Sequence, residues 1–466
     1  MSEQTPENQD ASQATADGRD TLNRFVVVTA AVSALGGFLF GFDTGVISGA
    51  LLFIREELSL SDFAQQVVVG SLLLAAVAGA LLGGPTSDGA GRKRTLIVAG
   101  VLFVAGSLVC AVAPGLLVLV IGRMILGLAV GIASMVVPIY IAEMAPPRFR
   151  GSLVSLQQFM ITVGILGAYL VNYAFSGAGA WRWMLGFGAL PGVILLLGML
   201  PLTESPRWLL ARGRRDQALS VLRRVRGEGA DVEAEAQEIE QARKAEASTN
   251  YRDLLQPSVR PALVVGVGIA FFNQMVGVNA ILYYAPSLFS DAGFGNSSAI
   301  LATTGVGVVF TLFTLAALLL IDRLGRRPLL LVGASVVFLS LVVLGAAYLL
   351  PEGSSLSNYL LVGGLMVYIA AFGASFGIAI WLLNGEVYPT EVRGKGSAAG
   401  AVTHWTLDFI IASTVLTLIN LITPTGLFWF YGLFAALALV FIWRRVPETK
   451  DRTLEQVSEA LAERAK

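Results

Sequence analysis

Cysteine and histidine are almost absent from this sequence, which has one of each, Cys110 and His404, among 466 residues. A single cysteine excludes an internal disulfide bond. With one residue of each kind, few nucleophile–base sets or metal-ligand clusters can be built, so we expect neither an enzyme nor a bound metal or cofactor. The net charge is zero, so no basic surface points to a nucleic-acid partner.

Charged residues are scarce in this sequence and apolar residues are abundant. Hydrophobic residues make up 55% of the chain and charged residues 14%, against roughly 25% charged in soluble domains. A run of about 20 apolar residues is long enough to cross a bilayer as a helix. Twelve such runs lie near residues 24–54, 63–84, 95–114, 116–142, 152–175, 181–202, 261–290, 298–321, 329–350, 358–386, 396–422 and 425–445. The sequence therefore predicts an all-α membrane protein with twelve transmembrane helices, embedded in a lipid bilayer.

The N-terminus and the distribution of basic residues indicate the topology. Residues 1–22 carry acids and amides with no basic run before an apolar core, which indicates a disordered tail and not a signal peptide. Cytoplasmic segments of membrane proteins are enriched in lysine and arginine. Placing both termini in the cytoplasm leaves only Arg55, Arg123 and Arg182, of 32 lysines and arginines, outside cytoplasmic segments. We therefore expect both termini to be cytoplasmic.

One long charged segment divides the chain. Residues 203–259 separate two six-span halves, residues 23–202 and 260–446, and residues 447–466 are expected to form a cytoplasmic C-terminal helix. Apolar residues within the segment recur at helical spacing, at Ala218, Val221, Leu222 and Val225. A second stretch begins with acids and ends with bases, the order that the helix dipole favours. We expect two or more short surface helices there, the alternative being a charged linker that merely joins the halves.

A short charge signature occurs twice, roughly half a chain apart. The first copy reads Asp88-x-x-Gly91-Arg92 and then Glu143-x-x-Pro146-x-x-x-Arg150-Gly151. The second reads Asp322-x-x-Gly325-Arg326 and then Glu386-x-x-Pro389-x-x-x-Arg393-Gly394. Duplication is the simplest interpretation, and two similar halves in an apolar chain are typical of transporters that rock one half against the other.

The signatures fall at the cytoplasmic ends of the expected helices. Acids and arginines there can pair between neighbouring helices while that side is closed, and they must separate when it opens. We therefore expect a cytoplasmic latch built from Asp88, Arg92, Glu143, Arg150, Asp322, Arg326, Glu386 and Arg393. The alternative is that these arginines only anchor the topology, which the matched spacing disfavours.

Two ionisable residues lie deep in the first half. Asp43 in the first span and Arg123 in the fourth would be costly in lipid unless they pair or face water, so each is a functional candidate. The alternative is a static pair that only holds the two helices together.

Longer motifs occur along the chain, namely GFDTGVISGAL (41–51), GRMILGLAVG (122–131), PIYIAEMAPPRFRGSL (138–153), ESPRWLL (204–210), FNQMVGVNAILYYAP (272–286), DRLGRRP (322–328) and VPETK (446–450). In this order they resemble the sugar porters of the major facilitator superfamily, over nearly everything after residue 24. The ESPRW and PETK elements are specific to sugar porters, whereas the Asp-x-x-Gly-Arg pattern indicates only the superfamily. The resemblance implies the major facilitator fold, with two pseudo-symmetric six-helix halves.

The resemblance also implies a set of sugar ligands. They are Gln158 in span five, Asn273, Gln274 and Asn279 in span seven, Trp381 in span ten, and His404 with Trp405 in span eleven. Tyr283 is expected to close over the site. Amide side chains suit sugar hydroxyls because each offers a donor and an acceptor, and an aromatic face suits the C–H surface of the ring. Any one of these residues taken alone could instead serve helix packing.

Three positions depart from the family pattern. Asn273 stands where the family usually has a second glutamine, which shortens its reach by one methylene. Ile378 replaces the proline of a Gly-Pro-x-x-Trp element, so we expect a weaker break in span ten. His404 replaces an amide, and Asp408 lies one helical turn further on. A carboxylate beside this histidine would favour the imidazolium, so the two could share a proton; alternatively, Asp408 only orients a neutral His404.

An acid at position 43 goes with proton coupling in this family. The resemblance therefore implies a transporter that takes up a monosaccharide together with a proton, with Asp43 and Arg123 as the coupling pair. Short loops and a compact tail favour a prokaryotic plasma membrane, and we expect a monomer. Facilitated diffusion without a proton and a non-transporting sugar sensor are the alternatives. Hexose, pentose and cyclic polyol all remain possible substrates.

Overall fold

The computed structural model describes residues 22–227, 230–247, 250–291, 293–351, 354–389 and 392–450, together with residues 452, 456, 457 and 461. The described residues form helices and no strand. The expected tail at 1–22 and the expected helix at 447–466 lie largely outside this part of the chain.

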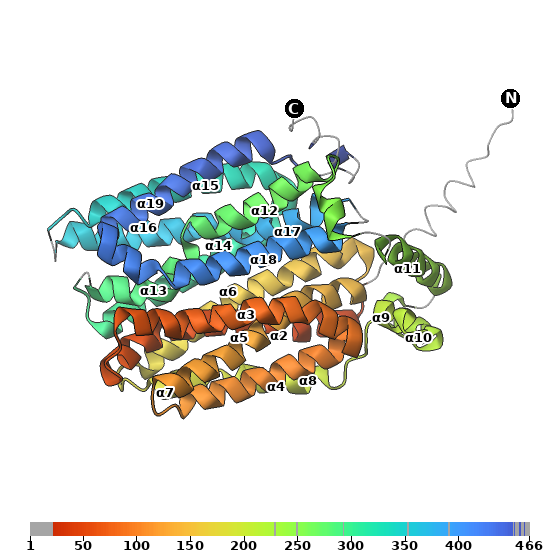
Figure 1. Ribbon diagram of the computed structural model, residues 1–466, viewed down its shortest axis with the longest axis horizontal. Coiled ribbons are helices and arrows are strands. Elements are labelled where there is room, and N and C mark those ends of the chain that lie inside the picture. The colour runs from red at the N-terminus through yellow and green to blue at the C-terminus, as the bar shows by residue number, and fades with distance from the viewer. Residues whose placement is uncertain are drawn as a thin grey trace.

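The first half forms a helical bundle, coloured red to yellow in Figure 1. Its elements are α2 (Arg24–Glu57), α3 (Asp62–Ala90), α4 (Arg92–Ala111), α5 (Leu116–Met144), the 3₁₀ turn η1 (Pro147–Phe149), α6 (Arg150–Ser176), α7 (Trp181–Gly186) and α8 (Ala189–Met199). Polar caps start the first two helices, because the side chains of Asn23 and Ser61 accept bonds from the free backbone N–H groups of Val26 and Ala64.

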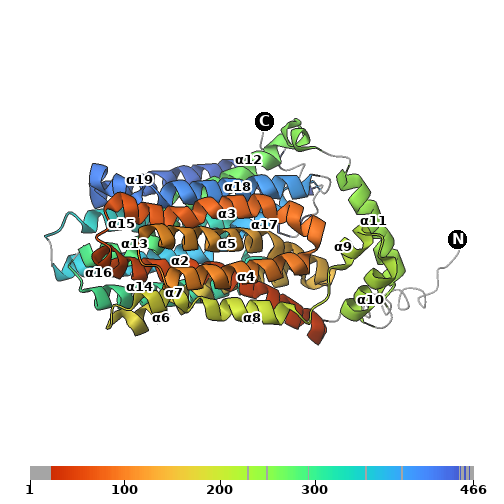
Figure 2. The same ribbon diagram turned by 60° about the horizontal axis from the view of Figure 1, so that its bottom comes forward.

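Short helices follow between the halves, at the end of the bundle where the signatures lie (Figure 2). They are α9 (Pro206–Ala211), α10 (Arg215–Arg226), α11 (Val232–Ala247) and the 3₁₀ turn η2 (Tyr251–Leu255). The apolar stripe of α10 is buried, and Arg226 at its end pairs with Glu235 of α11 and donates to the carbonyl of Met144 on α5. The expectation of short helices in this segment is confirmed.

The second half, coloured green to blue, repeats the arrangement of the first. Its elements are α12 (Arg260–Met275), α13 (Val278–Asp291), α14 (Asn296–Leu324), α15 (Arg326–Ala347), α16 (Ser355–Ala374), α17 (Phe376–Glu386), α18 (Arg393–Ala412) and α19 (Val415–Arg445). Three spans are interrupted, at residues 276–277, 375 and 413–414. The tenth span breaks at Ser375 although position 378 is isoleucine, so the absence of proline there does not leave the span continuous.

Eleven helical stretches of the described chain are long and apolar enough to cross a membrane. Helix α18 is more polar than these, because it carries Lys395, His404 and Asp408. It continues into the first part of α19, which changes direction at Thr423 with a backbone φ of 65°. Spans eleven and twelve therefore meet at Thr423 and Pro424, and the fold is the expected bundle of twelve helices.

The two halves meet along the long axis of the bundle. Helix α6 packs against α14 and α17, α3 against α18 and α19, and α2 against α13 (Figures 1 and 2). At the end opposite the signatures, polar bonds cross this boundary. Asn420 donates to Asp62 at 2.8 Å, and the amide of Gln66 bonds Thr417 at 3.1 Å. These bonds hold the halves together at that end.

Candidate functional site

A cavity lies between the two halves, near the middle of the bundle. The first half contributes Phe40, Thr44, Gln158, Ile161 and Ile165, and the second contributes Asn273, Gln274, Val278, Asn279, Leu282, Phe310, Phe372, Gly377, Ile380, Trp381 and His404. Polar groups are few and are set among apolar and aromatic surface, which is the usual composition of a small-molecule site. Six of the expected ligands line the cavity, whereas Tyr283 and Trp405 do not.

The break in span seven brings two of the amides together. Helix α12 ends at Met275, and Gly277 then takes a φ of 84°, where a side chain would be strained and would meet the ring of Tyr431. The carbonyl of Val276, freed by the break, accepts the hydroxyl of Tyr368 at 2.8 Å. Gln274 lies in the last turn before the break and Asn279 in the first turn after it, so both side chains reach the same space.

These amides form a chain of polar contacts with the histidine. The Nδ2 atom of Asn279 donates to Oε1 of Gln274 at 2.9 Å. The Nε2 atom of Gln274 lies 3.0 Å from Nδ1 and 3.1 Å from Nε2 of His404. An amide N–H needs an acceptor, so this contact fits a neutral imidazole, in which one ring nitrogen carries a free lone pair.

A second polar contact joins the two halves directly. Trp381 on α17 donates its indole N–H to Oε1 of Gln158 on α6 at 2.9 Å. The indole ring also lies against His404, with 5.3 Å between ring centroids. Both the amide and the aromatic face are therefore presented to the cavity from opposite halves.

The other expected ligands lie at its edge or behind it. Asn273 donates to the carbonyl of Phe376 at 3.2 Å, which occupies one of its amide hydrogens. Trp405 is fully buried and packs between His404 and Phe40. Tyr283 is buried on α13, and its hydroxyl has no hydrogen-bond partner among the described residues.

The proton-sharing pair of His404 and Asp408 is not formed. His404 bonds Gln274, whereas both carboxyl oxygens of Asp408 lack a hydrogen-bond partner in the described part of the chain. The two residues lie one turn apart on α18, as the sequence indicates, but their side chains serve different neighbours. Asp408 instead lies beside the amide of Asn279. The expectation that Asp408 pairs with the imidazole is therefore wrong for this state.

Asp43 and Arg123 form an ion pair deep within the first half. The Nη1 atom of Arg123 lies 2.8 Å from Oδ1 and 2.9 Å from Oδ2 of Asp43. Their side chains are 0% and 3% exposed. The Nε atom of Arg123 donates to the carbonyl of Val68 at 3.2 Å, while Nη2 has no partner in the described residues. The pair is thus only partly satisfied, which is a costly arrangement in a membrane interior.

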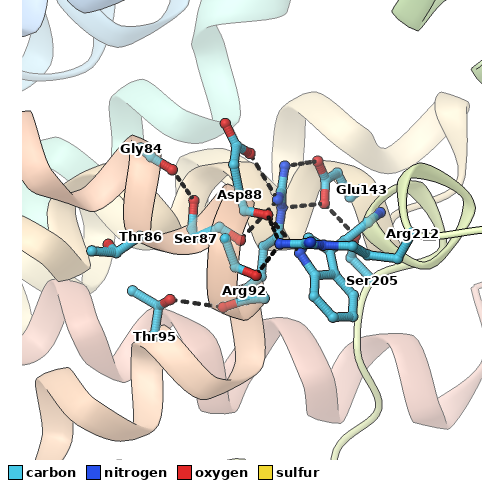
Figure 3. A network of polar contacts seen from close by, with 12 residues as sticks. Gly84, Thr86, Ser87, Asp88, Arg92, Thr95, Glu143, Ser205 and Arg212 are labelled. Atoms are coloured by element: carbon cyan, nitrogen blue, oxygen red, sulfur yellow. Dashed lines mark hydrogen bonds and ion pairs between the residues drawn. The ribbon is translucent and has the colours of Figure 1, made fainter.

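Near the short helices, Arg92 is held by two acids (Figure 3). Its guanidinium contacts Glu143 through two bonds of 3.0 and 3.1 Å, a fork arrangement that strengthens an ion pair. A third bond, of 2.9 Å, reaches the exposed Asp88 one turn back. Glu143 also accepts the hydroxyl of Ser205, at the start of α9. Helices α3, α4, α5 and α9 are therefore tied at one point.

The second half repeats this arrangement. Arg326 bonds Glu386 at 3.0 Å, and Glu386 accepts the hydroxyl of Thr449 at 2.5 Å. Thr449 thus corresponds to Ser205 of the first half. In both copies, the ion pair that the structure shows joins helices of the same half.

Two further acids complete the networks, and the sequence prediction had missed their role. Glu204 accepts the backbone N–H groups of Arg92 and Lys93 at 2.9 and 3.1 Å. Glu448 accepts those of Arg326 and Arg327, both at 3.0 Å. Each carboxylate therefore caps the positive end of a transmembrane helix from a distant part of the chain.

The signature glycines leave room for these caps. Gly91 and Gly325 have φ angles of 104° and 87°, and a side chain at either position would run into the capping carboxylate. The repeat of Glu in ESPRW and PETK, each after the last span of its half, is the sequence signal that could have identified both caps.

The remaining latch candidates are less constrained. Arg150 at the start of α6 is exposed, and no described acid lies within ion-pair distance of it. Arg393 begins α18. Asp322 lies in the last turn of α14, but its side chain is outside the described part of the structure.

Comparison with known proteins agrees with this geometry. The family model for sugar (and other) transporters matches residues 29–461. The chain is 41% identical over 430 residues to the D-xylose transporter of Levilactobacillus brevis, covering 92% of this chain and 94% of that protein. It is 39% identical over 431 residues to the galactose-proton symporter of Escherichia coli strain K12, covering 92% of this chain and 93% of that one.

A solved structure is similar over almost the whole length. The proton:xylose symporter XylE of the major facilitator superfamily, bound to 6-bromo-6-deoxy-D-glucose, superposes with a TM-score of 0.79 at 33% identity. The match covers 94% of this chain and 99% of XylE. The fold, the repeated motifs and these matches lead to one conclusion: the chain is a membrane transporter of the sugar (and other) transporter family, within the major facilitator superfamily.

Proposed function

We propose that this protein carries a monosaccharide together with a proton into the cell by alternating access. The observation that carries the proposal is the cavity between the halves, because amides, one imidazole and one indole from both halves face a single small space. Such a site suits a neutral ligand with many hydroxyls. The relatives named for xylose and galactose support a sugar as that ligand.

Sugar binding would replace contacts that the residues of the site make with one another. Two hydrogen bonds already pair donors with acceptors in the site, one between Asn279 and Gln274 and one between Trp381 and Gln158. A sugar hydroxyl that enters either pair therefore exchanges one hydrogen bond for another. The second bond joins the halves, and a sugar held there would connect them in its place. We assign Gln158, Gln274, Asn279 and Trp381 as direct ligands. Asn273, His404, Trp405 and Tyr283 complete the site, with Tyr283 closing over it after a change of position.

The coupling proton is proposed to act at Asp43. A neutral Asp43 holds Arg123 less strongly than the carboxylate does, because the charge–charge part of the interaction is lost. The helices that carry them, α2 and α5, would then be freer to move relative to each other. A transporter that only facilitates diffusion has no use for a buried ion pair that is costly in the membrane interior. The presence of the Asp43–Arg123 pair therefore favours symport over uncoupled diffusion.

The signature networks are proposed to lie on the cytoplasmic side, with both termini there, in a prokaryotic plasma membrane. The short helices α9, α10 and α11 lie at that end (Figure 2), and placing it in the cytoplasm puts all but three of the 32 lysines and arginines on cytoplasmic segments, as the positive-inside rule favours. By fixing the helix ends of each half, the two networks keep the halves as rigid bodies that can rock. Cavity and networks are built within one chain, which supports a monomer of two halves, 23–202 and 260–446.

Reconstitution in vesicles tests this function. Purified protein in liposomes is given an inward proton gradient and radiolabelled D-xylose, D-glucose, D-galactose or a cyclic polyol. We expect accumulation of at least one of these above its external concentration, and its loss when an ionophore dissipates the gradient. Equilibration without accumulation would establish facilitated diffusion instead. A thermal shift with a ligand that is never transported would indicate a sensor.

A further inference from the structure

Asp408 is a buried acid that has no role in the proposed sugar site or in the Asp43–Arg123 pair. It lies about one turn before the C-terminal end of α18 and is 0% exposed. Both of its carboxyl oxygens lack a hydrogen-bond partner in the described residues, and no described lysine, arginine or histidine forms an ion pair with it. This contrasts with Asp43, the other acid that is buried among the described side chains of the spans, which pairs with Arg123.

The helices that pack against α18 supply no cation to Asp408. On α13 the titratable neighbours are Tyr283 and Tyr284, and the hydroxyl of Tyr284 is used by the carbonyl of Ala412. His404 on α18 itself bonds Gln274. Among the described residues of the other packed helices, charges stand only at their ends: Asp62 and Asp88 on α3, Arg260 on α12 and Glu386 on α17, with Asp253 and Arg252 on η2. The Asp43–Arg123 pair lies beyond Tyr283.

Such surroundings favour the neutral acid. An ionised carboxylate that is buried without a cation or hydrogen bonds is strongly disfavoured, whereas a protonated carboxyl group is a small neutral donor. The neighbouring amide tells the two forms apart. An ionised Asp408 only accepts hydrogen bonds, so it would draw the Nδ2 atom of Asn279 toward itself. In the structure one N–H of that atom donates to Oε1 of Gln274 at 2.9 Å, and neither oxygen of Asp408 accepts a hydrogen bond from its other hydrogen.

We propose that Asp408 is a second proton-binding position, which holds its proton while Asn279 and Gln274 are bonded and loses it when Asn279 turns away from the sugar site. The inference rests on the proposed sugar ligands, and it extends them to the charge state of a residue behind them. The proton leaves the carboxyl oxygen for water that enters the cavity when one side opens, and no other group changes charge. Loss of the proton disorders two ligands at once, so a deprotonated Asp408 weakens sugar binding.

The first test detects the proton without any sugar. Infrared spectroscopy of purified protein across a pH titration separates the carbonyl stretch of a protonated carboxyl group from that of a carboxylate. The measurement is made in the Asp43→Asn background, which removes the other acid buried within the spans. We expect a protonated carboxyl band near neutral pH that disappears in Asp43→Asn/Asp408→Asn. A band that is the same in both variants would overturn the proposal, as would its absence from both.

A companion variant covers the case in which the double substitution does not fold. Asp408→Glu keeps a titratable acid at the same place but alters its environment, so the band should shift in frequency and not vanish. A band that keeps the frequency it has in the parent would assign the proton to another group and overturn the proposal.

The second test measures the consequence for binding. Calorimetry in the Asp43→Asn background uses whichever of D-xylose, D-glucose or D-galactose gives the largest thermal shift. Affinity should fall as pH rises through the titration of Asp408, by at most about tenfold per pH unit because one proton is involved. Asp408→Asn should flatten this dependence, whereas His404→Gln should leave it in place. A pH dependence that survives Asp408→Asn, or that His404→Gln alone removes, would refute the assignment. If none of these sugars binds while the infrared band behaves as expected, the choice of ligand is wrong and the proton site stands.

Discussion

Replacing Asp43 with asparagine separates the binding of sugar from the use of the proton gradient. The side chain keeps its size and one acceptor oxygen, but it can no longer carry a negative charge or take up a proton. The cavity lining is unchanged, because Asp43 does not contribute to it. Sugar binding and sugar–sugar exchange should therefore survive at least in part, while proton-driven accumulation is lost.

The expected sizes follow from the geometry of the pair. Arg123 is fully buried and keeps its charge, so the variant leaves that charge without its counterion. Removing one partner of a buried ion pair costs about 3–5 kcal/mol of stability. Asp43→Asn/Arg123→Met removes both charges and should recover much of that loss. For transport, one proton per sugar makes each pH unit of gradient equivalent to about 1.4 kcal/mol, or tenfold accumulation. The parent should approach that ratio and the single variant should stay at one.

The assay compares two modes of transport in the same liposomes. Counterflow reports exchange of labelled for unlabelled sugar and needs no proton movement, whereas uptake under an imposed pH gradient reports coupling. Thermal unfolding of the same preparations controls for folding. Uphill uptake by Asp43→Asn at the rate of the parent would refute the reasoning. Loss of counterflow in a correctly folded variant would count against it as well, because Asp43 would then serve binding.

Three further predictions follow from the site and the networks. Gln274→Ala or Asn279→Ala should weaken sugar binding by about 1–3 kcal/mol in calorimetry, because each variant leaves a polar group of its partner buried and unpaired. Trp381→Ala should also weaken binding, through the lost contact between its ring and the sugar. Unchanged affinity in correctly folded variants would mean that the site is misassigned. Glu143→Gln should loosen Arg92 and so make the helix ends of the first half less rigid, which slows net transport with ligand affinity retained. Spin-label distances between α4 and α5 at the signature end should broaden, and distances that stay as narrow as in the parent would refute this role. Asn420→Ala removes a bond between the halves at the opposite end and frees Asp62, so spin-label distances between the halves at that end should lengthen. Unchanged distances would show that this bond does not hold that end closed.

Much of the fold could be predicted because few backbone conformations are stable within a lipid bilayer. Apolar runs of spanning length must be helices, since no water is present to satisfy the backbone. The eleventh span was found although α18 is unusually polar, because its neighbouring residues in α19 extended the apolar run. The break at Ser375 was harder to foresee. Proline is the obvious signal for an interruption, and here a serine supplies it, bonding its own hydroxyl back to the carbonyl of Ala371 at 2.6 Å.

The site was only partly accessible to sequence reasoning. Residue types and motifs pointed to Gln274 and Asn279, and the cavity contains both. Which contacts they make depends on the turn at Gly277, and this could not be read from spacing along a regular helix. The same limit explains the error over His404 and Asp408, because residues one turn apart on a helix share a face but need not share a partner. Phe40 and Thr44 were missed because they flank Asp43, and that segment was assigned to proton coupling and not to the sugar site.

The two halves share the networks at their helix ends but differ in their buried polar residues. Arg92, Glu143 and Glu204 have counterparts in Arg326, Glu386 and Glu448, with the same roles, because both halves need rigid helix ends in order to move as bodies. The buried chemistry is not repeated. Among the described side chains, the ion pair in the membrane interior belongs to the first half alone, whereas the second half supplies most of the polar groups that line the cavity. A proton bound in one half can affect a sugar held mainly by the other only through the boundary between them. There Trp381 donates to Gln158, and the charges of Asp43 and Asp408 both act on Tyr283. Coupling in this protein is therefore expected to depend on contacts at that boundary more than on either site alone.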